Sequence, residues 1–261
     1  MSLTGKTPAD TYKDFLYVDN NNSGADSTVR SIKTGNGSAT GLGISTRHMR
    51  FLPDADSTTT LSVRDADGNV KLNVDTTNDQ VKALGHHINT QYAYFGISPH
   101  DSSSMLAGNH YAIQFQGGNY GSALVPFKMG TGTDPETSIT TADANYQRSS
   151  SLVTCLWYVP DNISIDSVTS LEGADAASGD TTRIHLMSYD FTSGSTSALT
   201  NGTLLAHNSD VTNAGSEQAY LSSFTVDSAN VSATKVIVAT FRQDSVNSDY
   251  SVNITVKYHL T

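Results

Sequence analysis

Apolar and polar residues alternate in short runs along much of this chain, and this period of two constrains its fold more than any other feature. In the last run, Val252, Ile254, Val256 and Tyr258 alternate with serine, asparagine, threonine and lysine. Successive side chains of a strand point to opposite faces of a sheet, so this run predicts a strand with one dry and one wet side. Long helical patterns are missing from the sequence, so we expect an all-β protein.

Residues 149–261 carry the strongest strand signals. Polar turns separate the runs every ten to fifteen residues, a spacing typical of a β-sandwich or jelly roll. We therefore predict a C-terminal antiparallel β-sandwich, jelly-roll-like, over 149–261. The predicted strands are 152–159, 163–171, 182–189, 203–206, 220–226, 235–241 and 251–259.

The sequence pattern of residues 1–85 predicts a β-ribbon or meander region. Weaker signals lie at 29–33 and 42–45, and the clearest meander alternates around two polar turns, with apolar positions at Leu61, Val63, Val70, Leu72, Val74, Val81 and Ala83. A ribbon of two or three strands is marginal alone in water. Three chains winding about one axis would cover each apolar face and hide the strand edges, so we expect a homotrimer. Residues 86–148 are either a linker or the opening strands of the C-terminal domain.

Charge and composition exclude several classes of function. The formal net charge is -10, and clustered Lys and Arg for phosphate neutralisation are missing, so we expect no nucleic-acid partner. No run approaches the roughly 20 apolar residues of a membrane-spanning helix, and the start lacks the apolar stretch of a secretion signal. We therefore expect a soluble protein made in the cytoplasm, without membrane insertion. Cys155 lies in an apolar run and is expected to be a small buried residue.

Two motifs resemble metal-binding motifs, but a role without a metal is favoured for each. The segment from Asp65 to Asn69 resembles the start of a calcium loop, but its glycine is the fourth residue and position twelve is Thr76, so a hairpin turn is favoured. His86 and His87 cannot share a strand face. A metal on a three-fold axis, held by one histidine from each chain, is the alternative to a solvated linker.

No catalytic residue, cofactor-binding residue or metal ligand is predicted. The chain lacks a nucleophile elbow, a zinc-binding helix motif and a phosphate loop. Five carboxylates could supply a glycosidase pair, although turn and cap roles are favoured: Asp161, Asp166, Glu172, Asp175 and Asp180. We therefore expect no enzymatic activity and no cofactor.

Aromatic residues offer a second kind of candidate site. They could stack on sugars or on a protein partner, although core packing is favoured for most of them: Tyr92, Tyr94, Phe95, Tyr111, Phe115 and Tyr120. Trp157 and Tyr158 precede Pro160 and are expected to seal a sandwich edge.

Several short motifs in the first third resemble virion structural proteins and tail fibres of marine tailed phages. They are Gly5-Lys6-Thr7-Pro8, Tyr12-Lys13-Asp14-Phe15-Leu16, Asp19-Asn20, Gly24-Ala25-Asp26, Gly35-Asn36-Gly37 and Leu42-Gly43-Ile44-Ser45. The unit from Leu61 to Thr77 similarly resembles the short β repeats of phage fibre shafts, in which three chains intertwine. The chain is shorter than a long tail fibre, which favours a short fibre, a head fibre or a capsid decoration protein.

The resemblance implies a location and a set of partners. In such proteins the N-terminal part attaches to other virion proteins and the C-terminal part projects, in some cases recognising a host surface receptor. We therefore expect a non-enzymatic, homotrimeric surface protein of a bacteriophage virion, assembled in the host cytoplasm. The alternatives are an adhesin tip that recognises a cell-surface glycan or protein and, least favoured, a small polysaccharide depolymerase.

Overall fold

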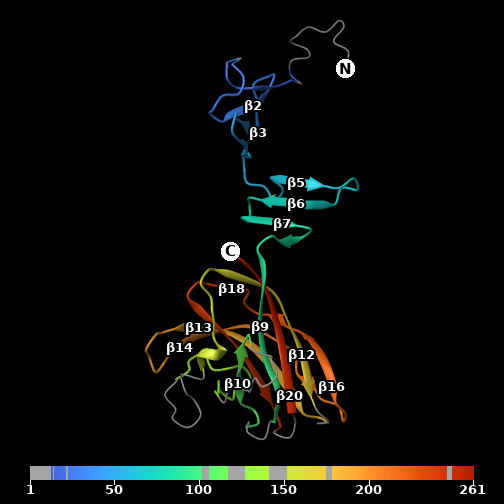
Figure 1. Ribbon diagram of the computed structural model, residues 1–261, viewed down its shortest axis with the longest axis vertical. Helices are drawn as coiled ribbons and strands as arrows, with labels where there is room; N and C mark the ends of the chain where they lie inside the picture. The colour runs from blue at the N-terminus through green and yellow to red at the C-terminus, as the bar shows by residue number, and fades with distance from the viewer. Residues whose placement is uncertain are drawn as a thin grey trace. The chain divides into compact units, whose positions relative to one another are not determined.

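The computed structural model describes Lys13 and residues 15–21, 23–101, 106–116, 127–140, 152–174, 178–245 and 249–261. Every strand pairing within these ranges is antiparallel (Figure 1). The chain divides into two compact units, Met1–Ile88 (unit 1) and Asn89–Thr261 (unit 2). The predicted fold class, all-β with an N-terminal ribbon or meander region and a C-terminal antiparallel β-sandwich, is confirmed by small N-terminal sheets and a large C-terminal antiparallel sheet.

Unit 1 consists of two four-stranded meanders. The first contains β1 (Leu16–Val18), β2 (Arg30–Thr34), β3 (Ala39–Ile44) and β4 (Met49–Phe51), and the second contains β5 (Leu61–Arg64), β6 (Val70–Asp75), β7 (Gln80–Ala83) and β8 (His86–His87). Their strand order follows the chain order. Short turns join most neighbouring strands, and the longer segment 19–29 joins β1 to β2. Gly37 and Gly68 take the positive φ values that two of these turns require.

Unit 2 is a twelve-stranded sheet folded into two layers. Its main path is β16-β12-β20-β9-β10-β19-β13-β14-β17, and β11, β15 and β18 pair at its margins. The strands are β9 (Thr90–Asp101), β10 (His110–Phe115), β11 (Trp157–Tyr158), β12 (Ile163–Ala174), β13 (Thr181–Phe191), β14 (Leu199–His207), β15 (Val211–Thr212), β16 (Gln218–Ser223), β17 (Thr225–Val226), β18 (Asn230–Val231), β19 (Lys235–Gln243) and β20 (Asp249–Leu260). β9 and β10 come from the segment 86–148 and lie within this sheet. The first layer contains β9, β12, β16, β18 and β20. The second layer contains β11, β13, β14, β15, β17 and β19.

Two features fold this sheet back on itself. β10 belongs to both layers, since Gln114 and Phe115 pair with β9 whereas residues 110–113 pair with β19. At the two ends of the path, β16 and β17 are separated in sequence only by Phe224. The sheet is therefore nearly closed, and only short stretches of strand edge remain open.

One predicted strand, 152–159, is wrong over most of its length. Val153–Cys155 form a 3₁₀ helix, and only Trp157–Tyr158 pair with β19. The run is continuously apolar rather than alternating, and Leu152 and Cys155 are both buried. Residues three apart lie on one side of a 3₁₀ turn, so a turn buries both side chains where a strand would expose one.

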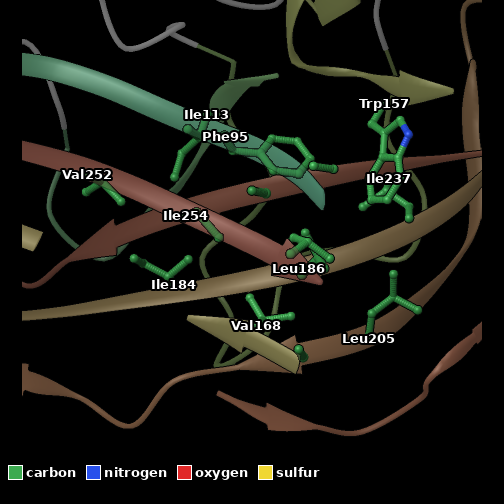
Figure 2. Packing of buried hydrophobic residues seen from close by; sticks show 14 of the residues in the cluster. Phe95, Ile113, Trp157, Val168, Ile184, Leu186, Leu205, Ile237, Val252 and Ile254 are labelled. Atoms are coloured by element: carbon green, nitrogen blue, oxygen red, sulfur yellow. The ribbon is translucent and has the colours of Figure 1, made fainter. Parts of the chain in front are cut away.

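Apolar side chains form a core on each side of the second layer. The main core lies between the layers, where Phe95, Val168, Ile184, Leu205 and Ile254 point toward one another (Figure 2). A second core lies on the outer side of β13 and β19, beneath segments 127–140 and 152–156. It contains Ala112, Phe127, Met129, Ile139, Leu152, Cys155, Met187, Tyr189, Leu199, Val236 and Val238. Cys155 is fully buried, as predicted, and burial raises the pKa of its thiol to about 12.

Gly202 of β14 marks the tightest packing in the second core. A Cβ at this position would lie 2.6 Å from a ring carbon of Tyr189 and 2.7 Å from the Cα of Thr137. We expect Gly202→Ala to lower the free energy of unfolding by about 2 kcal/mol, because neither neighbour has room to move. Urea unfolding would measure the loss. The control Thr203→Ala alters an exposed neighbour and should change stability by no more than about 0.5 kcal/mol; equal losses in both variants would contradict the steric explanation.

Candidate functional site: an open sheet face and buried polar clusters

The second meander of unit 1 has an apolar face that runs across three strands. The register places Leu61, Val74 and Val81 in one cross-strand row. Val63 and Leu72 lie in the next row with Ala83, which continues the same face. None of these side chains is buried, and Val63 is 49% exposed. The face that the alternation predicted is therefore present and open within one chain.

The segment after β5 is a hairpin turn, as predicted. One carboxylate oxygen of Asp65 accepts hydrogen bonds from the backbone N–H groups of Asp67 and Asn69, at 3.1 and 2.8 Å. Its other oxygen lies 2.9 Å from the Lys71 ammonium. The hydrogen bonds with Lys71 and Asn69 hold the pKa of Asp65 below its usual value. Asp65 thus closes the turn.

His86 and His87 form the two-residue strand β8. They pair with Ala83 and Lys82 of β7 respectively. As consecutive residues of a strand they point to opposite faces, so one chain presents only one of them on each face. A metal shared by three chains through one of these histidines stays the less favoured alternative.

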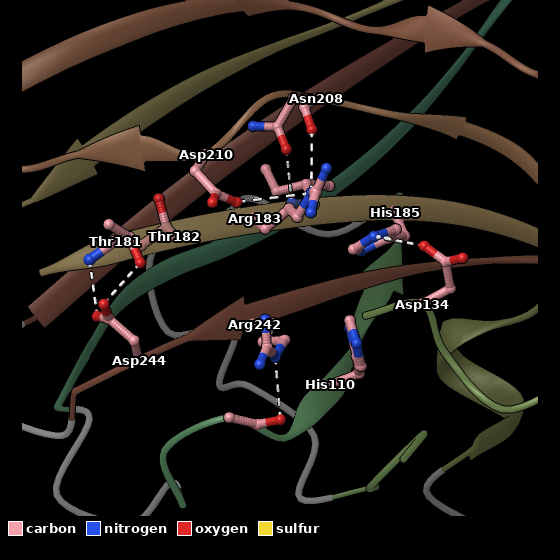
Figure 3. A network of polar contacts seen from close by, with 12 residues as sticks. His110, Asp134, Thr181, Thr182, Arg183, His185, Asn208, Asp210, Arg242 and Asp244 are labelled. Carbon is pink, nitrogen blue, oxygen red and sulfur yellow. Dashed lines mark hydrogen bonds and ion pairs between the residues drawn. The ribbon is translucent and has the colours of Figure 1, made fainter. Parts of the chain in front are cut away.

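A cluster of histidine and arginine side chains lies at one end of the second layer in unit 2. His110 of β10 and His185 of β13 are fully buried, and their ring centroids are 4.8 Å apart (Figure 3). The ring of His207 on β14 stacks 6.2 Å from that of His185. Arg183 and Arg242 belong to the same cluster, because the register sets them opposite each other on β13 and β19. Strands β10, β13, β14 and β19 therefore bring these five basic residues together.

Segment 130–136 covers the buried histidines. The Nε2 atom of His110 lies 3.1 Å from the carbonyl oxygen of Gly132. A carboxylate oxygen of Asp134 lies 3.4 Å from Nε2 of His185. Within the described part of the chain, Nδ1 of His110 and both ring nitrogens of His185 are buried without a hydrogen-bond partner. Such atoms cost free energy when buried, and an imidazolium would cost more.

These surroundings keep the buried imidazoles neutral. Burial is the largest cause, and the neighbouring His110, Arg183, His207 and Arg242 add to it, so that the pKa of His185 falls to about 3. Burial also lowers the pKa of His110, against the opposing effect of the Gly132 carbonyl. Both side chains are therefore uncharged near neutral pH, and acid conditions act against the folded state.

A second polar cluster surrounds Glu172, which is 2% exposed inside the sandwich. Its carboxylate accepts hydrogen bonds from Ser170 at 2.8 Å, from Asn208 at 3.0 Å and from Thr182 at 3.1 Å. Burial raises the pKa of Glu172, and these hydrogen bonds oppose that shift. Because β12 belongs to the first layer and β13 to the second, the Glu172–Thr182 hydrogen bond joins the layers.

The structure describes three of the other candidate carboxylates. Asp166 lies 2.9 Å from Nδ1 of His259, and Asp161 is exposed. The backbone carbonyl of Asp180 accepts a hydrogen bond from the N–H of Asn213. Asp175 lies outside the described residues. The partners of Glu172 described above are hydroxyl and amide groups, so the contacts at this residue are those of a structural carboxylate.

The candidate aromatic residues divide between core and surface. Phe95 and Tyr111 are buried, and Phe115 stacks on Trp157 with ring centroids 5.8 Å apart. Tyr120 lies outside the described residues. Tyr92 and Tyr94 are exposed on the outer side of β9, so the six residues do not form one platform. Trp157 is buried and Tyr158 is 55% exposed.

Sequence reasoning did not single out the histidine cluster. His110, His185 and His207 are separated by long stretches of chain, with no spacing that indicates a shared site. The available signal was local: His185 stands between Ile184 and Leu186 in a predicted strand, on the face it shares with Met187 and Tyr189. That pattern indicates burial of one histidine but does not indicate its neighbours.

Comparisons with known proteins add little to this description. No protein-family model matches the chain, and no curated protein matches it. Among solved structures, Eiger TNF from S. frugiperda matches 66% of this chain and 94% of its own, with 10% sequence identity and a TM-score of 0.29. A similarity of this size carries no argument about fold or function. Within the described residues, no helix has the length and apolar character needed to cross a membrane.

Proposed function

We propose that this chain is a non-enzymatic structural protein of a bacteriophage particle, a trimeric short fibre or capsid decoration protein. In this proposal unit 1 holds three copies together and attaches them to other virion proteins, and unit 2 projects from the surface. The observation that carries the proposal is the near absence of a core in unit 1. The resemblance of its motifs to those of phage virion proteins supports the location.

The two sheets of unit 1 bury very little of their own surface. Among its described residues, only Ile32 and Gly43 are buried. Isolated sheets of this kind gain too little from burial to offset the entropy lost when the chain is ordered. Unit 1 therefore needs a further surface to cover its apolar side chains.

Identical copies are the partners that suit unit 1 best. The apolar rows of the second meander run across three strands, and β5 and β8 are the outermost strands of its sheet. Three meanders around an axis cover each other's apolar faces and shield those edges at the same time. This arrangement also accounts for the small number of residues that unit 1 buries within a single chain.

The proposal makes two separate predictions about the full-length protein. Sedimentation velocity should give three times the 27.7 kDa mass of one chain. Mass spectrometry of purified particles of the phage that encodes the chain should detect the protein. A monomer that persists at high concentration would exclude the trimer, and consistent absence from particles would exclude the virion role.

A charge on the open face of unit 1 is expected to weaken the trimer. Leu72→Asp places a carboxylate at the centre of the apolar rows, where association would bury three like charges around the axis. We expect the concentration for half-assembly to rise at least about 100-fold, measured by sedimentation or native mass spectrometry. Ser62→Asp, from the opposite side of β5, is the control and should assemble like the wild type. Unchanged assembly of Leu72→Asp would mean that this face does not join the copies.

A further inference from the structure

The outer face of the first layer of unit 2 presents apolar side chains to solvent. In one cross-strand row, Leu171 of β12 lies between Leu221 of β16 and Asn253 of β20. Leu221 is 75% exposed and Leu171 is 57% exposed. Directly opposed leucines on an open sheet are costly unless another surface covers them.

The next row extends this surface across the whole layer. It runs from Ser223 through Thr169 and Thr255 to Tyr94 of β9, which is 47% exposed. These two rows, together with the adjoining Tyr92, are named here the outer sheet face. Strands β12, β20 and β9, which carry most of it, lie side by side in Figure 1. Tyrosine is enriched at the centre of protein interfaces, and acidic residues are depleted there.

The charge pattern indicates what covers this face. The chain has 25 acidic residues, yet neither row contains one. Charged side chains begin beyond these rows, with Lys257 opposite Tyr92 and with Asp166, whose carboxylate lies 2.9 Å from Nδ1 of His259. Copies of a chain with a net charge of -10 repel each other. They approach at least cost through a surface without carboxylates. A basic or acidic partner protein would gain little from such a neutral surface.

The polar groups of the face also suit an identical copy. Serine, threonine and tyrosine hydroxyls and the Asn253 amide both donate and accept hydrogen bonds. Such groups pair with their own kind, whereas a face of like charges does not. The polar groups of the face can therefore hydrogen-bond to those of identical copies when three such faces meet around one axis.

The size of the layer matches a stable contact. β9, β12 and β20 have 12 residues each, which corresponds to a length of ~40 Å at about 3.3 Å per residue. Together with β16, which has 6 residues, these strands at a spacing of about 4.8 Å give the whole layer, of which the outer sheet face is a part, an area on the order of 700 Å². A standard specific interface buries about 800 Å² per partner.

We propose that the outer sheet face of unit 2 is a contact between copies of this chain, through which neighbouring C-terminal units associate. This inference rests on the proposed trimer and names the surface that its projecting units use. Association through unit 1 raises the local concentration of these faces, so a moderate intrinsic affinity is sufficient. The contact is separate from the open face of unit 1 and is tested separately.

Thiol accessibility tests whether the face is covered in the full-length protein. Cys155 is buried, so an introduced surface cysteine provides the alkylation signal, with the wild type as background. Tyr94→Cys lies on the face, and Tyr158→Cys is the matched control, since Tyr94 and Tyr158 are 47% and 55% exposed in one chain. We expect alkylation of Tyr94→Cys to be at least about ten-fold slower than that of the control. Equal rates in the assembled protein would overturn the inference.

Charge substitution tests whether the face contributes to assembly. We expect the double variant Leu171→Glu/Leu221→Glu to dissociate at least about ten-fold more readily than the wild type in sedimentation. Phe191→Glu, at a position that is 42% exposed on β13, is the control and should assemble normally. If the wild type is trimeric and both the double variant and Tyr94→Cys behave like their controls, this inference fails while the proposed function stands. A monomeric wild type removes the proposed trimer itself.

Discussion

Replacing Glu172 with alanine is expected to lower the free energy of unfolding of unit 2 by about 3 to 4 kcal/mol. The substitution leaves the Ser170 and Thr182 hydroxyls and the Asn208 amide without their shared acceptor inside the sandwich. Each buried donor that loses its partner costs about 1 kcal/mol or more, and the removed side chain also leaves a cavity. Urea unfolding followed by tryptophan fluorescence is a suitable measurement, because Trp157 is packed against the main core.

The matched variant Glu172→Gln separates hydrogen bonding from charge. Its amide oxygen still accepts from Ser170 and Asn208, and the Thr182 hydroxyl turns to accept from the new amide group. We expect Glu172→Gln to cost about 1 kcal/mol, well below the loss in Glu172→Ala. Equal losses in the two variants would show that the hydrogen bonds do not stabilise this end of the sandwich.

Acidification is expected to destabilise unit 2 because His185 is buried in its neutral form. The unfolded chain takes up a proton at this residue near pH 6.5, whereas the folded protein does so only at about pH 3. Between these values the unfolded state binds more protons, so stability is fully present above pH 6.5 and falls as the pH is lowered toward 3. At pH 4.5 this corresponds to a loss of roughly 2.5 kcal/mol relative to neutral pH.

Two variants that cannot titrate test the source of this acid loss. His185→Gln and His185→Phe differ in polarity and size, so their stabilities at pH 7.5 will differ. Both should nevertheless lose less stability than the wild type between pH 7.5 and 4.5, as measured by urea unfolding at each pH. An acid loss as large as that of the wild type in both variants would exclude His185 as its cause.

The contribution of Glu172 to stability depends on pH in the opposite direction to that of His185. Its raised pKa means that the folded state keeps a proton at pH values where the unfolded state has lost it. The contribution of Glu172 therefore becomes more favourable as the pH falls toward the unfolded value near 4.5. Combining Glu172→Gln with His185→Gln tests how far the two effects are independent, because Asn208 hydrogen-bonds both to Glu172 and to Arg183 of the histidine cluster.

Local patterns predicted most of the strands. The run from Val252 to Tyr258 alternates cleanly, and β20 buries Val252, Ile254 and Val256 while Asn253 is exposed. The meander of β5 to β7 was predicted together with its turn at Asp65, because turn chemistry and alternation involve neighbours in sequence. There were two exceptions. In 152–159 a largely apolar run carries no period that distinguishes a strand from a 3₁₀ turn. The predicted strand 220–226 is divided at Phe224 between β16 and β17.

The sequence by itself therefore determined the all-β class, most strand positions and the open apolar face of unit 1, since each depends on residues close together in the chain. Only the tertiary structure decided that His110 and His185 share one buried cluster, that Glu172 joins the two layers and that Leu171 faces Leu221. These contacts depend on strand order and register across distant segments. A shift of one residue reverses the face on which each side chain lies, and local sequence does not specify which strands become neighbours.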